Sequence, residues 1–304
     1  MREPAPRMVR TAAKINLFLR VGRRRASGCH PVETVLQAID LGDELRVRAA
    51  APGTVSLSVA GRERLPAPED NLVIRAARLL VSEARRRGGA PPVGLAFHLT
   101  KRVPVGGGLG GGSGDAGAAL LLVNRFLNLR ISHRRLRALA RRLGADVPFF
   151  LLGGLAAGKG RGDRVRPLSP LPRLPVVIGV PRLRLATASV YGRFDHFPLT
   201  SSGCGITMRR VLEDLGKGRK VAEFVHDLQG PVFHDHPDLE RVRDALQEQG
   251  ALLAGLSGSG AALFGIFRRR PRLKRHLFAP WRRKGWVFRH CWTLLREEYL
   301  ARFC

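Results

Sequence analysis

The sequence predicts an α+β fold with two lobes, and three observations support this fold class. Hydrophobic residues make up 44% and charged residues 25% of the 304 residues, which is typical of a globular protein with a sizeable core. Segments with a period of two and segments with helical spacing both occur. They do not alternate regularly as strand–helix–strand units, the pattern of a parallel sheet. We expect residues 1–165 to form the first lobe and residues 166–304 the second.

Strand patterns begin near the N-terminus. Aliphatic residues at 15, 17, 19 and 21 alternate with other residues, the period of a half-buried strand over 11–21. Lys14 and Asn16 then share the face opposite the aliphatic one. Alternation also predicts strands over 45–48, 55–59 and 93–99, and an apolar run predicts a strand over 175–180.

Helical spacing predicts several helices. The first begins at Leu72, with Asp70 as its N-cap, and ends near the signature Arg85 to Gly88. Further helices are expected over 116–127, over 132–144 with Ser132 as the cap, and over 238–249. The uncharged stretch Gly250–Phe267 contains five glycines and two serines, so we expect a strand, a turn and a strand there rather than a membrane span.

The charge balance is strongly basic. Lysine and arginine number 53 against 24 acidic residues, a net charge of +29, which is typical of proteins with polyanionic partners. The arginines are spread along the chain, and aromatic residues are only 6%, so no platform for stacking nucleic-acid bases stands out. We interpret the excess as compositional drift and expect neither nucleic acid nor membrane as a partner.

The four cysteines form no close pair. This spacing argues against a disulfide framework and against a cysteine metal site, and it favours a reducing compartment. We therefore expect a cytoplasmic protein. As a separate expectation, the protein is a monomer or a weak homodimer.

A glycine-rich run separates the strand at 93–99 from the helix at 116–127. Glycines let backbone N–H groups approach a phosphate closely, and the N-terminal end of a helix attracts anions. A flexible linker is rarely placed between two such clear elements, so we expect a phosphate-binding loop. Gly106, Gly108 and Gly111 also fit GxGxxG, but a dinucleotide fold needs a following strand with an acid at its end, where we predict only helix.

A second glycine pattern imitates a P-loop. Gly153, Gly158 and Lys159 match GxxxxGK, but position 160 is glycine where a P-loop has Ser or Thr for magnesium. The flanking residues have the pattern of a sheet, so we expect no P-loop here.

Two charged residues are candidates for catalysis. Lys14 is one of only seven lysines, and a compact ammonium with an adjustable pKa suits an active site. Asp146 is an acid set against the apolar stretch 147–150. Each also fits an ordinary role, Lys14 on the surface and Asp146 at a helix end, and His30 alone fits any loop histidine.

Taken together and in order, several segments resemble the GHMP small-molecule kinases, which include galactokinase and homoserine, mevalonate and phosphomevalonate kinases. The segments span residues 11 to about 265 and are Ala13–Leu17, Gly28–His30, Gln37–Asp43, Asn71–Leu72, Pro104–Ala116, Leu143–Phe150 and Leu256–Gly260. The resemblance implies a two-lobed α+β kinase. Its N-terminal lobe would resemble domain 2 of ribosomal protein S5, and its C-terminal lobe would be an α/β sandwich.

The resemblance also implies a reaction, the phosphorylation of a small-molecule alcohol by ATP, with Mg²⁺ delivered with the ATP. Lys14 and Asp146 match the catalytic pair, with Asp146 orienting or deprotonating the hydroxyl and Lys14 tuning the charge beside it. Ser113 and Asp115 would lie near the metal and the phosphates. The positions that match the ATP site are Asn71, Lys101, Pro104, Val105, Gly106, Gly107, Gly108, Leu109, Gly110, Gly111, Gly112, Ser113, Gly114 and Asp115.

Within the superfamily, the implied substrate is a methylerythritol linked to cytidine diphosphate. Phosphorylation would occur at its 2-hydroxyl, on the non-mevalonate route to isoprenoid precursors. Asn16, His30 and Thr187 match the positions that hold this substrate. Two alternatives stay open: a kinase of the same family with another alcohol as substrate, and a basic nucleic-acid-associated protein with the same fold.

Several positions depart from the family pattern, among them Gln229, where a glutamate is usual. Cys29 stands where the family usually has a tyrosine, so an aromatic face expected to stack on the cytosine is missing. Ala186 stands where a serine is usual, and His226 where an asparagine is usual. A neighbouring aromatic, Tyr191 or Phe194, is a candidate to replace the missing ring.

Overall fold

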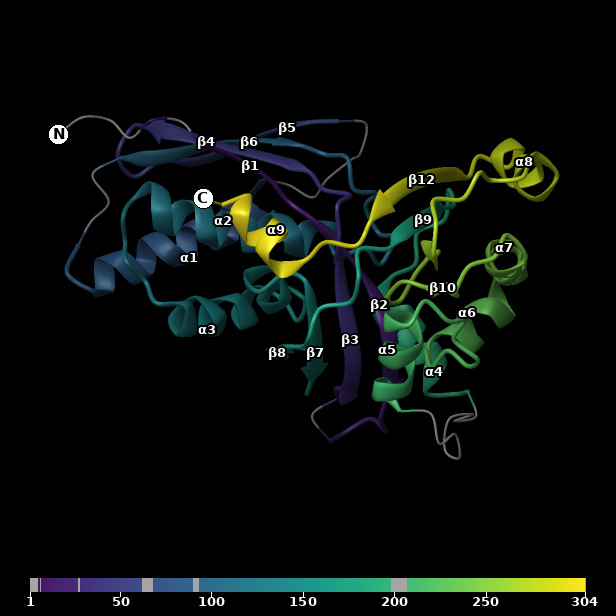
Figure 1. The fold of residues 1–304 in the computed structure, drawn as a ribbon. Coiled ribbons are helices and arrows are strands. Elements are labelled where there is room, and N and C mark those ends of the chain that lie inside the picture. The colour runs from purple at the N-terminus through teal and green to yellow at the C-terminus, as the bar shows by residue number, and fades with distance from the viewer. Residues whose placement is uncertain are drawn as a thin grey trace.

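The described part of the chain contains sheets of four strands each, with helices packed against them (Figure 1). The computed structural model describes residues 5, 7–26, 28–61, 68–89, 93–197 and 207–303. The strands are β1 (Arg7–Arg10), β2 (Ala13–Val21), β3 (Val32–Ile39), β4 (Glu44–Ala50), β5 (Val55–Ala60), β6 (Gly94–Thr100), β7 (Leu155–Lys159), β8 (Arg164–Pro167), β9 (Pro175–Val180), β10 (Leu253–Leu256), β11 (Leu263–Ile266) and β12 (Val287–Trp292). The α-helices are α1 (Leu72–Arg86), α2 (Gly111–Phe126), α3 (His133–Leu143), α4 (Thr187–Phe194), α5 (Met208–Gly216), α6 (Gln229–Asp235), α7 (Pro237–Glu248), α8 (Arg275–Arg283) and α9 (Arg296–Ala301).

The first sheet, in the order β1-β4-β6-β5, forms an outer layer of the N-terminal half. Its pairs are antiparallel except that β5 runs parallel to β6. Helices α1, α2 and α3 lie below this sheet in Figure 1, and their apolar side chains share a core with those of the strands. The strands predicted at 45–48, 55–59 and 93–99 and the helices predicted from Leu72 and from the Ser132 cap are confirmed, with shifted ends.

Two details of the helix starts differ from the prediction. The N-cap of α1 is Asn71 rather than Asp70, because Oδ1 of Asn71 accepts the backbone N–H of Val73 at 2.9 Å. Helix α2 begins at Gly111, inside the glycine run, and not at Ala116. Close packing compensates for the poor helix propensity of glycine here. A Cβ on Gly114 would stand 2.5 Å from the backbone oxygen of Ala12, so only glycine fits between α2 and the chain before β2.

The second sheet, in the order β2-β3-β7-β8, lies in the middle of the molecule. The prediction that β2 is half-buried is wrong, because both of its faces are buried. Ile15 and Leu17 pack in a core shared with the third sheet, whereas Lys14 and Asn16 point toward the glycine run and the turn at 257–260. An alternating pattern is therefore compatible with burial on both sides when one buried face is polar.

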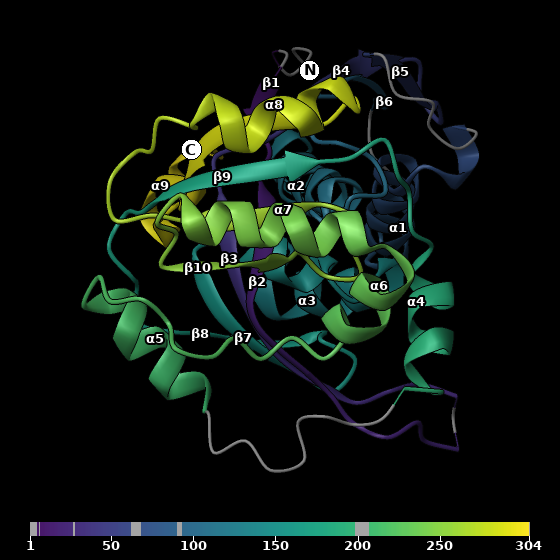
Figure 2. The same cartoon turned by 90° about the vertical axis from the view of Figure 1, so that its right-hand side faces the viewer.

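The third sheet, in the order β10-β11-β9-β12, belongs to the C-terminal half. Figure 2 shows α7 and α8 in front of this sheet, and their apolar residues pack on it. The predicted strand at 175–180 and the predicted strand, turn and strand within Gly250–Phe267 are confirmed as β9 and as β10 and β11. Among the described residues, no helix combines the length and the apolar character that crossing a membrane requires.

Several elements carried no clear sequence pattern, among them β3, the helices α4 to α6, and α8. The absence of a P-loop at 153–160 is confirmed, because Gly158 and Lys159 lie in β7 and the next element is β8. The last helix, α9, returns to the N-terminal half, where Tyr299 packs with Phe149 and Phe150 (Figure 1). The architecture is α+β, as predicted.

Candidate active site

Lys14 lies on β2 with its ammonium inside the protein, where the residue is 3% exposed. Its Nζ donates a hydrogen bond to Oδ1 of Asn16 at 2.7 Å. The backbone of Lys14 is fixed from two sides, because its N–H donates to the carbonyl of Leu109 at 2.9 Å and its carbonyl accepts from Oγ of Ser257 at 3.2 Å. Burial lowers the pKa of Lys14, and the negative charge of Asp146 opposes this shift.

Asp146 stands between α3 and a 3-10 turn over Val147–Leu151. Its Oδ2 lies 3.8 Å from Nζ of Lys14, so the structure brings the two predicted catalytic groups together. The carboxylate makes no capping hydrogen bond to the turn that follows, and its side chain is 37% exposed. A carboxylate that faces a cavity beside a buried ammonium can accept a proton from a bound hydroxyl.

The glycine run encloses a cavity of about 310 Å³, whose lining includes Asn71, Lys101 and every residue from Pro104 to Ser113 together with Asp115. Gly106, Gly108 and Gly110 have φ values of 76°, 73° and 69°, which favour glycine. The first residues of α2 also line this cavity, so the positive end of the helix dipole faces it. The cavity therefore fits an anion held by backbone N–H groups and a helix N-terminus.

Lys101 and Asp115 form a buried cluster with Asp43 at the base of this cavity. Nζ of Lys101 is 2.9 Å from Oδ2 of Asp115 and also donates to Asp43. Burial raises the pKa of Asp115 to about 7, although Lys101 opposes the shift. Burial lowers the pKa of Lys101, but the two carboxylates outweigh burial and raise it. The ammonium of Lys101 is thus shared by two carboxylates of the protein.

The turn at 257–260 of the C-terminal half docks on the glycine run. Oγ of Ser257 donates to the carbonyl of Gly108 at 3.1 Å, and Ala262 N–H donates to the carbonyl of Gly107 at 3.1 Å. A Cβ on Gly108 would stand 1.9 Å from the carbonyl oxygen of Ser257, so this contact requires glycine. In the same turn, Gly258 N–H donates to Oδ1 of Asn16 at 2.9 Å.

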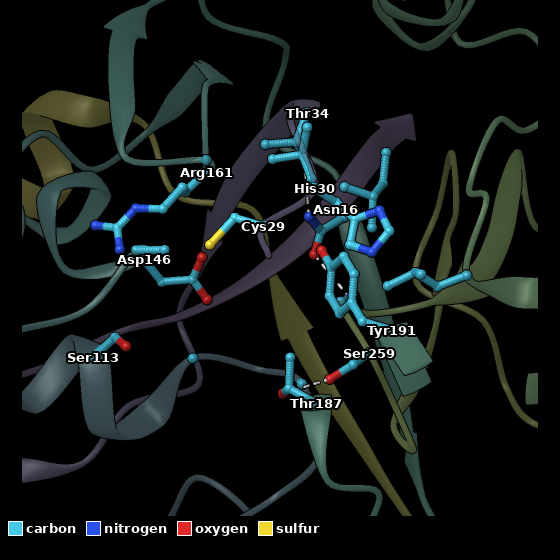
Figure 3. Close-up of a pocket in the computed structure, with 18 of the residues that line it drawn as sticks. Asn16, Cys29, His30, Thr34, Ser113, Asp146, Arg161, Thr187, Tyr191 and Ser259 are labelled. Atoms are coloured by element: carbon cyan, nitrogen blue, oxygen red, sulfur yellow. Dashed lines mark hydrogen bonds between the residues drawn. The ribbon is translucent and has the colours of Figure 1, made fainter. Parts of the chain in front are cut away.

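A second cavity, of about 610 Å³, lies beside the first, and its lining contains Lys14, Asp146, Asn16, His30 and Thr187. Figure 3 shows Asp146 and Tyr191 on opposite sides of this cavity, with Cys29 between them in that view. The structure thus brings together the predicted catalytic and substrate-binding residues.

Gly108, Gly110 and Ser113 line both cavities. The cavity formed by the glycine run, here called the glycine cradle, is therefore open toward Lys14 and Asp146. This shared rim is the place where a phosphoryl group could pass from one ligand to another.

The predicted substrate-binding residues already have partners in the protein. Besides the contacts described above, Asn16 donates from Nδ2 to Oγ1 of Thr34 at 2.9 Å, and Thr187 Oγ1 lies 2.9 Å from Oγ of Ser259. Asn16 therefore positions the Lys14 ammonium as well as lining the cavity. His30 likewise has a partner on each ring nitrogen, Gly22 and Asp195.

Sequence reasoning did not assign Thr34, Arg161, Ser259 or Asp195 to the site. Arg161 lies on the turn between β7 and β8 and lines the substrate-side cavity (Figure 3). One signal was available for Tyr191, since it follows Thr187 by four residues and so shares its helix face. The same spacing continues to Asp195, which follows Tyr191 by four residues. No local pattern marks Thr34, Arg161 or Ser259, because their strands and turns meet the cavity only through tertiary contacts.

Two family models match the chain, the GHMP kinases N terminal domain over residues 71–154 and the GHMP kinases C terminal model over residues 209–282. A 4-diphosphocytidyl-2-C-methyl-D-erythritol kinase of Pelotomaculum thermopropionicum is 40% identical over 255 residues, which cover 84% of this chain and 86% of that protein. The same-named protein of Cutibacterium acnes is 38% identical over 257 residues, 83% of each chain. This chain belongs to the 4-diphosphocytidyl-2-C-methyl-D-erythritol kinase family of GHMP kinases.

Solved structures agree with membership in the GHMP kinases. The crystal structure of a 4-(cytidine 5'-diphospho)-2C-methyl-D-erythritol kinase matches with a TM-score of 0.77 at 35% identity, covering 94% of this chain and 99% of that one. A homoserine kinase of Cytophaga hutchinsonii has a TM-score of 0.69 at 18% identity, covering 98% and 97%, which supports the fold alone. The predicted GHMP kinase fold is confirmed, and this GHMP kinase is an ATP-dependent small-molecule kinase.

Proposed function

We propose that this chain transfers the γ-phosphoryl group of ATP to the 2-hydroxyl of 4-diphosphocytidyl-2-C-methyl-D-erythritol, on the non-mevalonate route to isoprenoid precursors. The observation that carries the proposal is the shared rim of Gly108, Gly110 and Ser113, which joins the glycine cradle to the cavity of Lys14 and Asp146. The names of the relatives supply the substrate, and the two joined cavities supply the geometry for a transfer between two bound ligands.

Three side chains of the substrate-side cavity, those of Asp146, Lys14 and Asn16, have different parts in the transfer. Asp146 accepts the proton of the attacking hydroxyl, whose oxygen forms a bond to the γ-phosphorus while the bond from that phosphorus to the β–γ bridging oxygen breaks and ADP leaves. The ammonium of Lys14, 3.8 Å from the carboxylate, stabilises the negative charge that develops. Asn16 fixes that ammonium through its hydrogen bond of 2.7 Å. Transfer then depends mainly on positioning and charge.

The far end of the substrate-side cavity fits a nucleoside. Tyr191 offers a ring, and burial raises its pKa to about 12, so the phenol stays neutral. We place the cytidine at this end, near His30 and Thr187, and the alcohol near Asp146. A cavity of about 610 Å³ is in the range of small-molecule sites.

The glycine cradle would hold ATP, with Asn71 and Lys101 in its wall. Within the described residues, no group of three or more His, Cys, Asp or Glu side chains gathers as a metal site. Mg²⁺ would therefore arrive with the nucleotide, which suits an ion that is usually bound through substrate phosphates and few protein ligands. We also propose that the enzyme works in the cytoplasm, because the cysteine spacing favours a reducing compartment.

An ATP-consumption assay tests the substrate. We expect turnover with 4-diphosphocytidyl-2-C-methyl-D-erythritol and background rates with mevalonate, homoserine and galactose at equal concentrations. Turnover of one of the other alcohols alone would replace the proposed substrate but keep the kinase. The Asp146→Ala variant serves as the control for contaminating kinases, since it should remove the signal.

A further inference from the structure

His30 is held by two groups that can only accept hydrogen bonds. Its Nδ1 lies 2.9 Å from the carbonyl oxygen of Gly22, and its Nε2 lies 3.1 Å from Oδ1 of Asp195. Both ring nitrogens are therefore engaged by the protein, and the carboxylate of Asp195 is one of the two groups that hold the ring.

Asp195 also contacts Arg24, near the start of the connection between β2 and β3, whereas His30 lies near its end. Its Oδ2 is 3.6 Å from Nη1 of Arg24, and Nε of Arg24 donates to the carbonyl of Gly28 at 3.1 Å. The connection carries Cys29 and His30, both of which line the substrate-side cavity. One carboxylate thus contacts both ends of the segment that forms one wall of this cavity.

Asp195 lies at the end of α4, the helix that contributes Thr187 and Tyr191 to the opposite wall of the cavity. It follows the last residue of α4, and Thr187, Tyr191 and Asp195 recur every four residues, which places them along one side of the helix. Thr187 and Tyr191 line the cavity, whereas Asp195 lies behind His30 and outside the lining. The ring of His30 contacts that of Tyr191, with centroids 5.4 Å apart, and that of Phe194 at 5.8 Å.

We propose that Asp195 is a positioning residue for the nucleoside end of the substrate. Its carboxylate holds the imidazole of His30 and the guanidinium of Arg24 and so fixes the wall formed by Cys29 and His30 against the wall formed by Tyr191. The proposal rests on the proposed function, because it assigns the cytidine to this end of the cavity. It also implies that the ring nitrogens of His30 are not available to the base, so His30 acts by its shape and its backbone.

Binding of cytidine diphosphate, measured by calorimetry, tests this role. We expect Asp195→Ala to raise the Kd for cytidine diphosphate by about tenfold, the effect of losing about 1.4 kcal/mol. The KM for the full substrate should rise in parallel, while kcat and the KM for ATP change by less than about twofold, because the loss is uniform binding remote from the reacting atoms. Asp195→Asn keeps the shape and can still form a hydrogen bond with Nε2 of His30, so its Kd should lie between those of the wild type and Asp195→Ala.

An ion pair made by another residue of α4 provides a control. Asp235, at the end of α6, pairs with Arg193 of α4 at 2.9 Å and does not line the substrate-side cavity. Asp235→Asn removes an ion pair of α4 away from this cavity, so it should leave the Kd for cytidine diphosphate unchanged. Equal losses of affinity in Asp235→Asn and Asp195→Asn would reduce Asp195 to a structural role and overturn the proposal.

The position of the wall gives an independent readout. In ¹H–¹⁵N spectra, the backbone amides of Cys29 and His30 should shift in Asp195→Ala and stay in place in Asp235→Asn, because of the two acids only Asp195 contacts His30 and Arg24. Unshifted amides in Asp195→Ala would overturn the proposal, as would equal Kd values in the wild type and Asp195→Ala. If the wild type does not bind cytidine diphosphate at all, the proposed substrate fails, and the assignment of Asp195 to a nucleoside site fails with it, whatever the spectrum shows.

Discussion

The ammonium of Lys14 donates a hydrogen bond of 2.7 Å to the side-chain oxygen of Asn16, two residues along the same strand. That oxygen also accepts the N–H of Gly258 at 2.9 Å, so a turn of the C-terminal half helps to place the lysine. Asp146 completes the arrangement from the other side, 3.8 Å from the ammonium. Both members of the proposed catalytic pair thus lie in the N-terminal half, and a turn of the C-terminal half helps to hold Lys14 in place.

Removing either catalytic group should lower turnover. Asp146→Ala and Lys14→Ala should each reduce kcat by about 10²-fold or more, the scale of a positioned acid–base group. The Kd for ATP should change much less in Asp146→Ala, because Asp146 lines only the substrate-side cavity. Steady-state kinetics with Asp238→Ala, a half-buried acid on α7 that lines neither cavity, provide the control. Near-wild-type turnover in Asp146→Ala would remove the proposed mechanism.

The glycine cradle should fail when a side chain enters it. Gly110→Val and Gly111→Val should abolish ATP binding, but both also crowd protein atoms, since a Cβ at Gly111 would stand 2.9 Å from Val103 and one at Gly110 3.1 Å from Lys14. Gly112→Val isolates the effect, because among the described residues, apart from its own helix backbone and chain neighbours, its Cβ would have within 4 Å only Cδ1 of Leu72, at 3.9 Å.

For Gly112→Val we expect the Kd for ATP to rise by about tenfold or more, with the free energy of unfolding changed by less than about 1 kcal/mol. Titration with ATP and urea denaturation measure the two quantities. If the three valine variants all bind ATP as the wild type does, the glycine run is not the phosphate cradle.

His226 should make the protein sensitive to acid. It is buried, and neither ring nitrogen has a hydrogen-bond partner in the part of the chain that the structure describes. Burial, with a smaller effect of Lys14, lowers the pKa of His226 to about 3. The unfolded chain binds this proton near pH 6.5 and the folded chain does not, so stability is lost as the pH falls from about 6.5 toward 3.

His226→Asn restores the residue usual in the family and removes this titration. Between pH 7 and pH 5, the wild type should lose about 2 kcal/mol more free energy of unfolding than the variant, the value that follows from the lowered pKa. Urea denaturation at the two pH values measures the difference. Parallel losses in both proteins would show that His226 is not the buried acid-sensitive group.

Cys29 is the position where an aromatic ring can be added to the nucleoside end. It is exposed and lines the cavity, whereas Tyr191 lies on another side of it (Figure 3). Stacking of a base on an aromatic ring is worth roughly 1–3 kcal/mol, so Cys29→Tyr should lower KM for the substrate several-fold with little change in kcat. Cys29→Ser keeps the size and should leave KM near that of the wild type.

Binding of cytidine diphosphate separates the outcomes for Cys29→Tyr. Tighter binding would support a cytosine site that lacks one stacking face. Weaker binding would mean that Tyr191 already fills the space and that the added ring clashes with it.

Much of the site could be read from residue types and local order. The glycine run between a strand and a helix, the lone lysine of the first long strand and the acid before an apolar stretch are local features, and each carries its own physical reason. The ends of elements were harder to predict, as α2 shows, because Gly111 and Gly114 are helical only through packing against distant residues.

The sequence by itself predicted the α+β class and marked the glycine run, Lys14 and Asp146 as candidates for the site, because backbone freedom, periodicity and side-chain chemistry are properties of neighbouring residues. Only the tertiary structure decided which distant groups meet. Asp195 contacts His30 from far along the chain, Asp43 and Asp115 share Lys101, and Ser257 docks on Gly108. These contacts depend on how the sheets pack against one another, and no local pattern specifies such packing, since many distant partners would satisfy the same short segment equally well.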